Sequence, residues 1–165
     1  MIASEDPRRA SPAWLAWSAL PDETARRLDE GGAALEIGCG SGYGCLAMAE
    51  RFPAISVTGH DRDPAAIARA RMLAAAADLA WRVRFQIDDS LRLPRASADV
   101  IVAVATLERR DAGRLLNAIR NALVPEGVCL LVAEAGAAGK ARALTTGAGF
   151  SRLRRLQAAL FELRR

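Results

Sequence analysis

Short apolar segments alternate with segments of helix length along most of this 165-residue chain. The apolar segments, which we predict to be strands, lie at residues 33–37, 55–59, 83–87, 100–104 and 128–133. Helices are expected over residues 44–51, 64–79 and 112–123. Strands and helices in this order form βαβ units around a parallel sheet, so the sequence predicts an α/β fold.

The two ends of the chain differ from this pattern. Two short helices are predicted over residues 12–20 and 22–30, the first with Ser11 as its N-cap. We interpret residues 1–32 as a helical cover and 33–165 as the main domain of one globular unit. Ser151–Gln157 and Leu160–Arg164 resemble strands whose link is too short for a crossover helix. They are therefore expected to pair antiparallel.

Composition excludes several classes of protein. No apolar run approaches the ~20 residues of a membrane span. The first residues carry acids and a proline where a signal peptide needs an apolar stretch, so we expect a cytoplasmic protein without membrane association. Cys39, Cys45 and Cys129 are an odd number without metal-ligand spacing, and His60 is the only histidine. We therefore expect buried thiols and no metal site.

Arginine supplies almost all of the positive charge, because Lys140 is the only lysine and the net charge is +4. Arginines can bind phosphates, so a nucleic-acid partner was considered. The arginines are spread along the chain without aromatic residues between them, however, and a nucleic-acid partner is therefore disfavoured.

A glycine-rich segment, EIGCGSGYG at residues 36–44, follows the first predicted strand. Glycines here permit a tight turn and a close approach of backbone to a ligand, and the next helix offers free N–H groups. Glu36 would place an anion where a ligand ammonium could bind. A dinucleotide motif, G-x-G-x-x-G, is disfavoured because its third glycine would fall on Tyr43, and the frame from Gly42 starts too far beyond the strand.

Two further acidic positions follow the next two strands. Asp61 ends the second strand, and a carboxylate there can accept both hydroxyls of a ribose. Asp63 with Pro64 already supplies the start of the following helix, which favours the ribose role for Asp61 over a helix cap. Asp89 and Ser90, after the third strand, could recognise adenine through a carboxylate and a backbone N–H, although such a pair is equally typical of a turn.

Together these motifs resemble the class I S-adenosylmethionine-dependent methyltransferases, from about residue 33 to the C-terminus. The motifs that carry the resemblance are Glu36, Gly38, Gly40 and Gly42, then Asp61, Asp89-Ser90, residues 98–102, residues 123–127 and residues 148–150. The resemblance implies S-adenosylmethionine as cofactor and a doubly wound sheet of order 3-2-1-4-5-7-6, with helices on both faces and strand seven antiparallel. It also implies that Gly38 and Cys39 contact the methionine part, that Arg62 lies beside the adenine, and that Val104 and Ala105 lie near the amino group.

The sequence says less about the reaction. Methyl transfer from a sulfonium needs little beyond an acceptor held in line, and a general base only where the acceptor must lose a proton. Glu108 and Glu134 are candidate bases, although Glu108 is more readily explained as a solvated helix-start acid. Many relatives carry histidines around Glu108 and this chain has none there. Motifs for methylation of nucleic-acid bases, N-P-P-Y and Pro-Cys, are also absent from the sequence.

The segment that could cover the binding site is a second difference from the family that this chain resembles. Only residues 135–148 separate the fifth strand from the final pair, where many relatives insert lid helices. The first helix with Trp14 and Trp17, or a second subunit in a homodimer, could cover the site instead. Simple packing of an amphipathic helix explains the two tryptophans at least as well. Three hypotheses follow: a small-molecule methyltransferase, a methyltransferase for RNA or protein, and a module that binds the cofactor without transferring anything.

Overall fold

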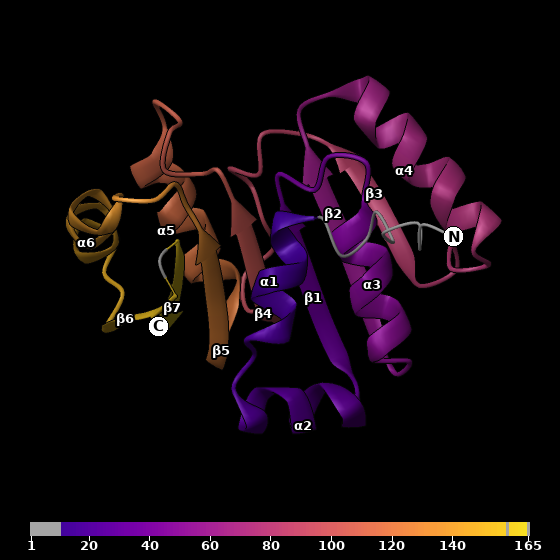
Figure 1. The fold of residues 1–165 in the computed structure, drawn as a ribbon, viewed down its shortest axis with the longest axis horizontal. Coiled ribbons are helices and arrows are strands. Elements are labelled where there is room, and N and C mark those ends of the chain that lie inside the picture. The colour runs from indigo at the N-terminus through magenta and orange to yellow at the C-terminus, as the bar shows by residue number, and fades with distance from the viewer. Residues whose placement is uncertain (1–10, 158, 165) are drawn as a thin grey trace, which may run out of the picture.

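A seven-stranded mixed sheet forms the centre of the molecule in a computed structural model that describes residues 11–157 and 159–164 (Figure 1). The strands are β1 (Gly32–Ile37), β2 (Ile55–Asp61), β3 (Val83–Ile87), β4 (Ala98–Val104), β5 (Leu123–Val132), β6 (Arg152–Gln157) and β7 (Leu160–Arg164). Their order is β3-β2-β1-β4-β5-β7-β6, with β1 to β5 parallel and β7 antiparallel to both neighbours. This confirms the predicted sheet and its terminal hairpin.

Helices cover both faces of the sheet. They are α1 (Pro12–Ser18), α2 (Asp22–Glu30), α3 (Tyr43–Arg51), α4 (Pro64–Ala76), α5 (Ala112–Ala122) and α6 (Ala138–Gly147). One hydrophobic core lies between the sheet and α1, α3 and α4, and a second lies between the sheet and α5 and α6. Alternate residues of β4 serve the two cores: Val100 and Val102 belong to the first, and Ile101 and Ala103 to the second. This division explains why the segment is apolar at every position.

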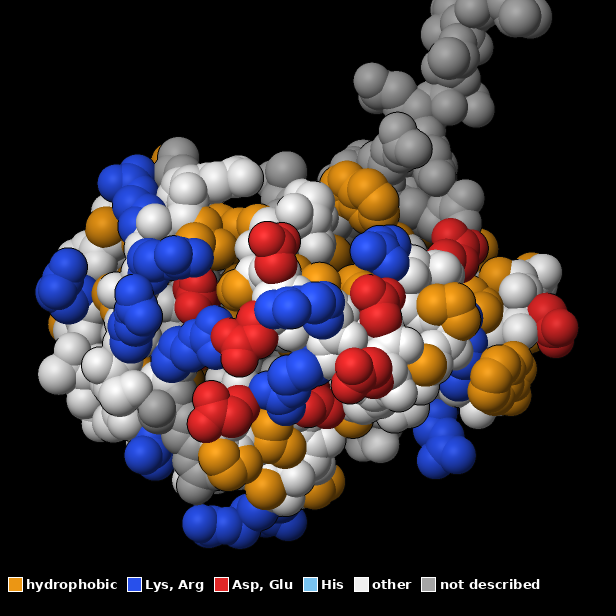
Figure 2. Space-filling model, turned by 90° about the horizontal axis from the view of Figure 1, so that it is seen from below, with side chains coloured by type: hydrophobic (Ala, Val, Ile, Leu, Met, Phe, Trp, Pro, Cys, Tyr) orange, Lys and Arg blue, Asp and Glu red, His pale blue; other side chains and the backbone are white. Residues whose placement is uncertain are grey.

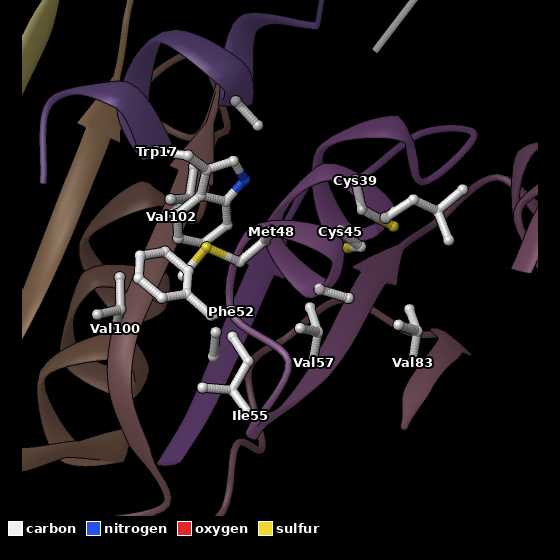
Figure 3. Close-up of a cluster of buried hydrophobic side chains, with 14 of the residues drawn as sticks. Trp17, Cys39, Cys45, Met48, Phe52, Ile55, Val57, Val83, Val100 and Val102 are labelled. Carbon is white, nitrogen blue, oxygen red and sulfur yellow. The ribbon is translucent and has the colours of Figure 1, made fainter. Parts of the chain in front are cut away.

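Aromatic and sulfur-containing side chains fill the first core (Figure 3). Trp17 of α1 lies beside Met48 and Phe52, and all three side chains are buried against β4. Burying a side chain of this size stabilises the fold by about 1.5–3 kcal/mol. The three cysteines are free and buried, so they serve as small core residues as predicted.

A salt bridge joins helix α2 to the amino end of the sheet. Arg27 pairs with Asp99 at 2.7 Å, and the second carboxylate oxygen of Asp99 accepts the Ala33 N–H at 3.0 Å. A Cβ on Gly32 would lie 2.7 Å from the same carboxylate. The opposite, carboxyl ends of the parallel strands point away from α2 and are left to loops (Figure 1).

The structure differs most from the prediction in three places, and other element ends shift by one or two residues. Helix α4 ends at Ala76 rather than residue 79, and Asp78 has a φ of 54°. Strand β5 begins five residues early, at Leu123, where a register shift lets it pair with Ala98. Helix α6 was not predicted, because only Ala141 and Thr145 along it are buried and no apolar periodicity marks it.

Candidate functional site

A cavity of about 220 Å³ lies at the carboxyl ends of β1, β2, β3 and β4. This is the edge of an open α/β sheet where ligands generally bind. The loops after these four strands all contribute to the lining, which consists of Ile37, Gly38, His60, Asp61, Arg62, Asp88, Ser90, Val104, Ala105, Thr106 and Arg109.

The glycine-rich loop after β1 requires glycine at several positions. Gly38, Gly40 and Gly42 have φ values of 75°, 52° and 79°, which L-residues with a Cβ rarely adopt. A Cβ on Gly38 would lie 2.8 Å from the Val104 carbonyl oxygen, so the loop passes directly against the end of β4. The Gly38 and Cys39 N–H groups donate to the His60 carbonyl at 2.9 and 3.2 Å, which fixes the loop to β2.

Asp61 holds the other side of this loop. Its Oδ2 accepts the Gly40 N–H at 2.8 Å, and its Oδ1 accepts the Asp63 N–H at 2.9 Å. Each carboxylate oxygen has a second lone pair, so both can still accept a hydroxyl from a ligand. Asp61 is half-buried and lines the cavity, as the ribose role requires.

The loop after β3 places a different acid at the cavity than the sequence predicted. Asp88 lines it: its carboxylate lies 2.9 Å from His60 Nδ1 and accepts the Ser90 N–H at 2.7 Å. Asp89 is exposed, lies outside the lining and accepts the Leu91 N–H at 3.1 Å. The difference arises because Asp88, one residue past β3, is drawn inward by the buried His60.

Glu36 lies beneath the glycine-rich loop instead of facing the cavity. Its side chain is fully buried, accepts from Cys45 Sγ at 3.2 Å, and leaves no room for a Cβ on Gly44. Burial raises the pKa of Glu36 to about 8, partly offset by the hydrogen bond from Cys45. The predicted contact between Glu36 and a ligand ammonium therefore has no counterpart in the cavity lining.

The last residue of β4, Val104, and the next two residues, Ala105 and Thr106, also line the cavity. Ala105 has a φ of 50°, and Ser90 across the cavity has a φ of 58°. Such backbone strain in residues with a Cβ clusters at functional sites. The Thr106 side chain is 2% exposed, and its Oγ1 has no hydrogen-bond partner among the described residues. A buried hydroxyl without a partner is costly, so Thr106 offers a polar group for a ligand.

Two arginines meet one carboxylate beside the cavity. Arg109 binds both oxygens of Asp111, at 2.8 and 2.9 Å, and Arg62 reaches Asp111 Oδ2 at 2.9 Å. Hydrogen bonds from Arg109 hold the pKa of Asp111 well below its usual range. Arg109 also donates to the Asp89 carbonyl at 2.9 Å, which joins the loops after β3 and β4.

The structure brings together part of the predicted site. Six of the eleven predicted cofactor residues line the cavity: Gly38, Asp61, Arg62, Ser90, Val104 and Ala105. The other five, Glu36, Cys39, Gly40, Gly42 and Asp89, lie beneath it, in the adjoining loop or at the surface. Sequence reasoning missed four polar lining residues, His60, Asp88, Thr106 and Arg109. Their positions at or soon after strand ends were a signal, but which of these residues turn inward depends on contacts between different loops.

None of the candidates for catalysis or cover lines the cavity. Glu108 and Glu134 are exposed, and Glu108 Oε2 lies 2.9 Å from Lys140 Nζ of α6. Trp14 and Trp17 line a separate cavity of about 340 Å³ between α1 and α3, with Trp17 buried in the first core. Their positions therefore agree with packing of an amphipathic helix and not with a wall of the cavity at the carboxyl edge.

The lining has the chemistry that a nucleoside-bearing sulfonium amino acid requires. Asp61 supplies an acceptor for hydroxyls, the glycine-rich loop brings bare backbone to the cavity, and Thr106 supplies an unused hydroxyl. The described residues contain no group of three or more His, Cys, Asp or Glu side chains arranged to hold a metal ion. None of the described helices has the length and apolar character needed to cross a bilayer.

Solved structures with the same fold include several methyltransferases. The mitomycin 7-O-methyltransferase MmcR is 20% identical over 94% of this chain and 52% of its own, with a TM-score of 0.69. The phosphoethanolamine N-methyltransferase 2 of Haemonchus contortus, solved with phosphomonomethylethanolamine and S-adenosylhomocysteine, is 20% identical over 81% of this chain and 38% of its own, with a TM-score of 0.64. The [4+2]-cyclase SpnF is 26% identical over 81% of this chain and 58% of its own, with a TM-score of 0.67.

This chain therefore spans between about two fifths and three fifths of the length of these structures. No curated protein matches the sequence. Residues 34–127, more than half of the chain, match the profile of a family described as a methyltransferase domain. That range begins in β1 and ends in β5, and so includes the loops that line the cavity. The chain belongs to the methyltransferase domain family.

Proposed function

We propose that this protein is an S-adenosylmethionine-dependent methyltransferase that acts on a small-molecule acceptor. One observation carries the proposal: Gly38, Asp61 and Ser90, at or just after the carboxyl ends of three neighbouring strands, line a single cavity at that edge of the sheet. The family match supports the reaction type, and the Haemonchus contortus neighbour, solved with S-adenosylhomocysteine, supports the cofactor.

Each side of the cavity is proposed to hold a different part of the cofactor. Asp61 accepts the ribose hydroxyls with the lone pairs that its two backbone hydrogen bonds leave free. Ser90 and Asp89 lie on the adenine side with Arg62, and Asp88 joins them because it lines the cavity.

The methionine part is proposed to lie over the glycine-rich loop. Gly38 and Cys39 contact it, Gly40 and Gly42 shape the loop, and Glu36 supports the loop from beneath. Beside this loop, the backbone of Val104 and Ala105 is proposed to accept from the amino group. The unpartnered Thr106 hydroxyl adds a contact on this side.

The protein's contribution to the reaction is mainly positional. When bound, S-adenosylmethionine would supply an electrophilic methyl group, whose carbon would bond to an acceptor lone pair as its bond to sulfur breaks and S-adenosylhomocysteine leaves. Fixing two reacting groups in line can lower a barrier by several kcal/mol without further chemistry. No base is proposed for an acceptor that must lose a proton: Glu108, the candidate from the sequence, lies outside the cavity lining and pairs with Lys140.

Two alternatives predict different behaviour. A methyltransferase for RNA or protein needs a surface that attracts its polymer, and such binding weakens steeply with salt. Figure 2 shows the α2 side, opposite to the cavity; this face carries acidic and basic side chains together, with basic ones gathered mainly at the left, on the side of the β6–β7 hairpin. A module that binds S-adenosylmethionine without transferring anything is the second alternative, suggested by the short segment at residues 135–148 and by the missing histidines around Glu108. A cytoplasmic location and a homodimer stay predictions of the sequence.

Calorimetry and a product assay separate these possibilities. We expect S-adenosylmethionine and S-adenosylhomocysteine to bind in a one-to-one ratio and NAD not to bind. S-adenosylhomocysteine release should rise with at least one small hydroxyl, amine or thiol acceptor in a broad panel. Binding of NAD alone would contradict the cofactor assignment. Tight cofactor binding, with release stimulated only by RNA or protein or by no acceptor at all, would favour the alternatives.

A further inference from the structure

One ion pair joins loops from two sides of the cofactor cavity. Arg62 follows β2 and Asp111 precedes α5, and the two strands concerned, β2 and β4, flank β1 and its glycine-rich loop. The Arg62 guanidinium reaches Asp111 Oδ2 at 2.9 Å. Because Arg109 ties Asp111 to the Asp89 carbonyl, the loops after β2, β3 and β4 are all connected beside the cavity.

The connected loops narrow the cavity below the usual size of a ligand site. Sites for drug-sized ligands have volumes of about 300–1,000 Å³. This cavity has about 220 Å³, and Arg62 and Arg109 both form part of its lining. Movement of either side chain would enlarge the space for a nucleoside joined to an amino acid.

We propose that the Arg62–Asp111 ion pair is a clasp that must open before S-adenosylmethionine or S-adenosylhomocysteine can bind. This inference rests on the proposed function, and it makes Asp111 a positioning residue that acts on access to the site. Arg62, once released from Asp111, is free to lie beside the adenine.

Contacts and exposure identify Arg62 as the moving side. Its side chain is 54% exposed and has one hydrogen bond to Asp111, whereas the Arg109 side chain is 17% exposed and bonds both oxygens of Asp111. An exposed single-contact pair contributes little to stability and opens readily, and a bidentate pair holds its geometry better. The low pKa of Asp111 means that mild acid leaves the clasp charged, so ionic strength rather than pH should control it.

Association of S-adenosylhomocysteine, measured by surface plasmon resonance on the immobilised full chain, tests the clasp. This ligand has no net charge at neutral pH, so salt acts mainly on the protein. We expect Arg62→Met and Asp111→Asn each to raise the association rate constant, by up to about fivefold for an exposed pair. The double variant should be no faster than the faster single variant, because both substitutions remove the Arg62–Asp111 contact. Raising NaCl from about 0.05 to about 0.5 M should speed association to the parent protein but not to the variants.

Asp29→Asn is the matched control, because it breaks an exposed pair with Arg51 outside the cavity lining and should leave association unchanged. Arg62→Met guards against a folding defect in Asp111→Asn, since it leaves the Arg109–Asp111 contact in place. Unchanged or slower association of Arg62→Met, or additive effects in the double variant, would overturn the clasp. Failure of the parent protein to bind S-adenosylhomocysteine would instead overturn the proposed function, and the clasp with it.

Discussion

Glu36 shows how one residue can follow a family motif and serve a structural purpose. The sequence places it at the carboxyl end of β1, and the predicted role was a contact with a ligand ammonium. In the structure it is buried beneath the glycine-rich loop, beside Gly44 and Cys45. The sequence could not show this, because burial depends on α1, whose Ala13 also packs at Gly44.

Burial of Glu36 predicts an unusual dependence of stability on pH. Its pKa is about 8 when folded and returns toward 4.5 in the unfolded chain. Between these values the folded state keeps a proton that the unfolded state releases. The stability contributed by the protonated group is therefore complete below about pH 4.5 and is lost as pH rises through about 8. The total effect is on the order of a few kcal/mol.

Glu36→Gln should remove this dependence. The free energy of unfolding, measured with urea at several pH values between about 5 and 8, should fall less steeply with pH in the variant. The difference in slope should correspond to nearly one proton bound by the folded parent protein and released on unfolding. Glu30→Gln, at an exposed position on α2, is the control and should keep the parent slope. Identical slopes for Glu36→Gln and the parent protein would show that Glu36 is ionised in the folded state.

At the scale of elements, the strand–loop–helix units were predictable and their cross-links were not. Strand β3, helix α2 and strand β7 begin and end where the sequence predicted. Helix α6 was missed because its sequence has almost no apolar face. The Asp88–His60 and Arg62–Asp111 contacts join different units, so no local pattern announces them.

Because the glycine-rich loop after β1 packs tightly against β4, we expect that adding one methyl group at Gly38 strongly destabilises the fold. Gly38→Ala must adopt a φ of 75° and place its Cβ 2.8 Å from a backbone oxygen. The left-handed conformation alone costs about 1–2 kcal/mol, and the contact adds to this. We expect a loss of at least ~2 kcal/mol in the free energy of unfolding in urea, together with weaker binding of S-adenosylhomocysteine.

Gly113→Ala is the matched control for this substitution. Gly113 lies in α5, and nothing lies within 4 Å of the Cβ position. Alanine there should stabilise the protein by up to ~1 kcal/mol through its higher helix propensity. Equal effects of the two substitutions would mean that the loop does not require glycine at residue 38.

For the molecule as a whole, sheet topology is what assembles the site. The order β3-β2-β1-β4 sets four loops side by side although they come from widely separated parts of the chain. Alternation of strands and helices was enough to predict the parallel sheet, and the resemblance supplied its order. The lining was predicted only in part, because which residue of a loop turns inward depends on partners such as His60 and Val104.

The central claim is that the Asp61 carboxylate binds the cofactor, and calorimetric titration of S-adenosylhomocysteine into Asp61→Asn tests it most directly. A lost hydrogen bond to a charged group costs about 1.5–3 kcal/mol, so affinity should fall by roughly 10- to 100-fold. Asp29→Asn should bind like the parent protein, and circular dichroism should confirm that both variants are folded. Parent-like affinity in a folded Asp61→Asn variant would contradict the claim.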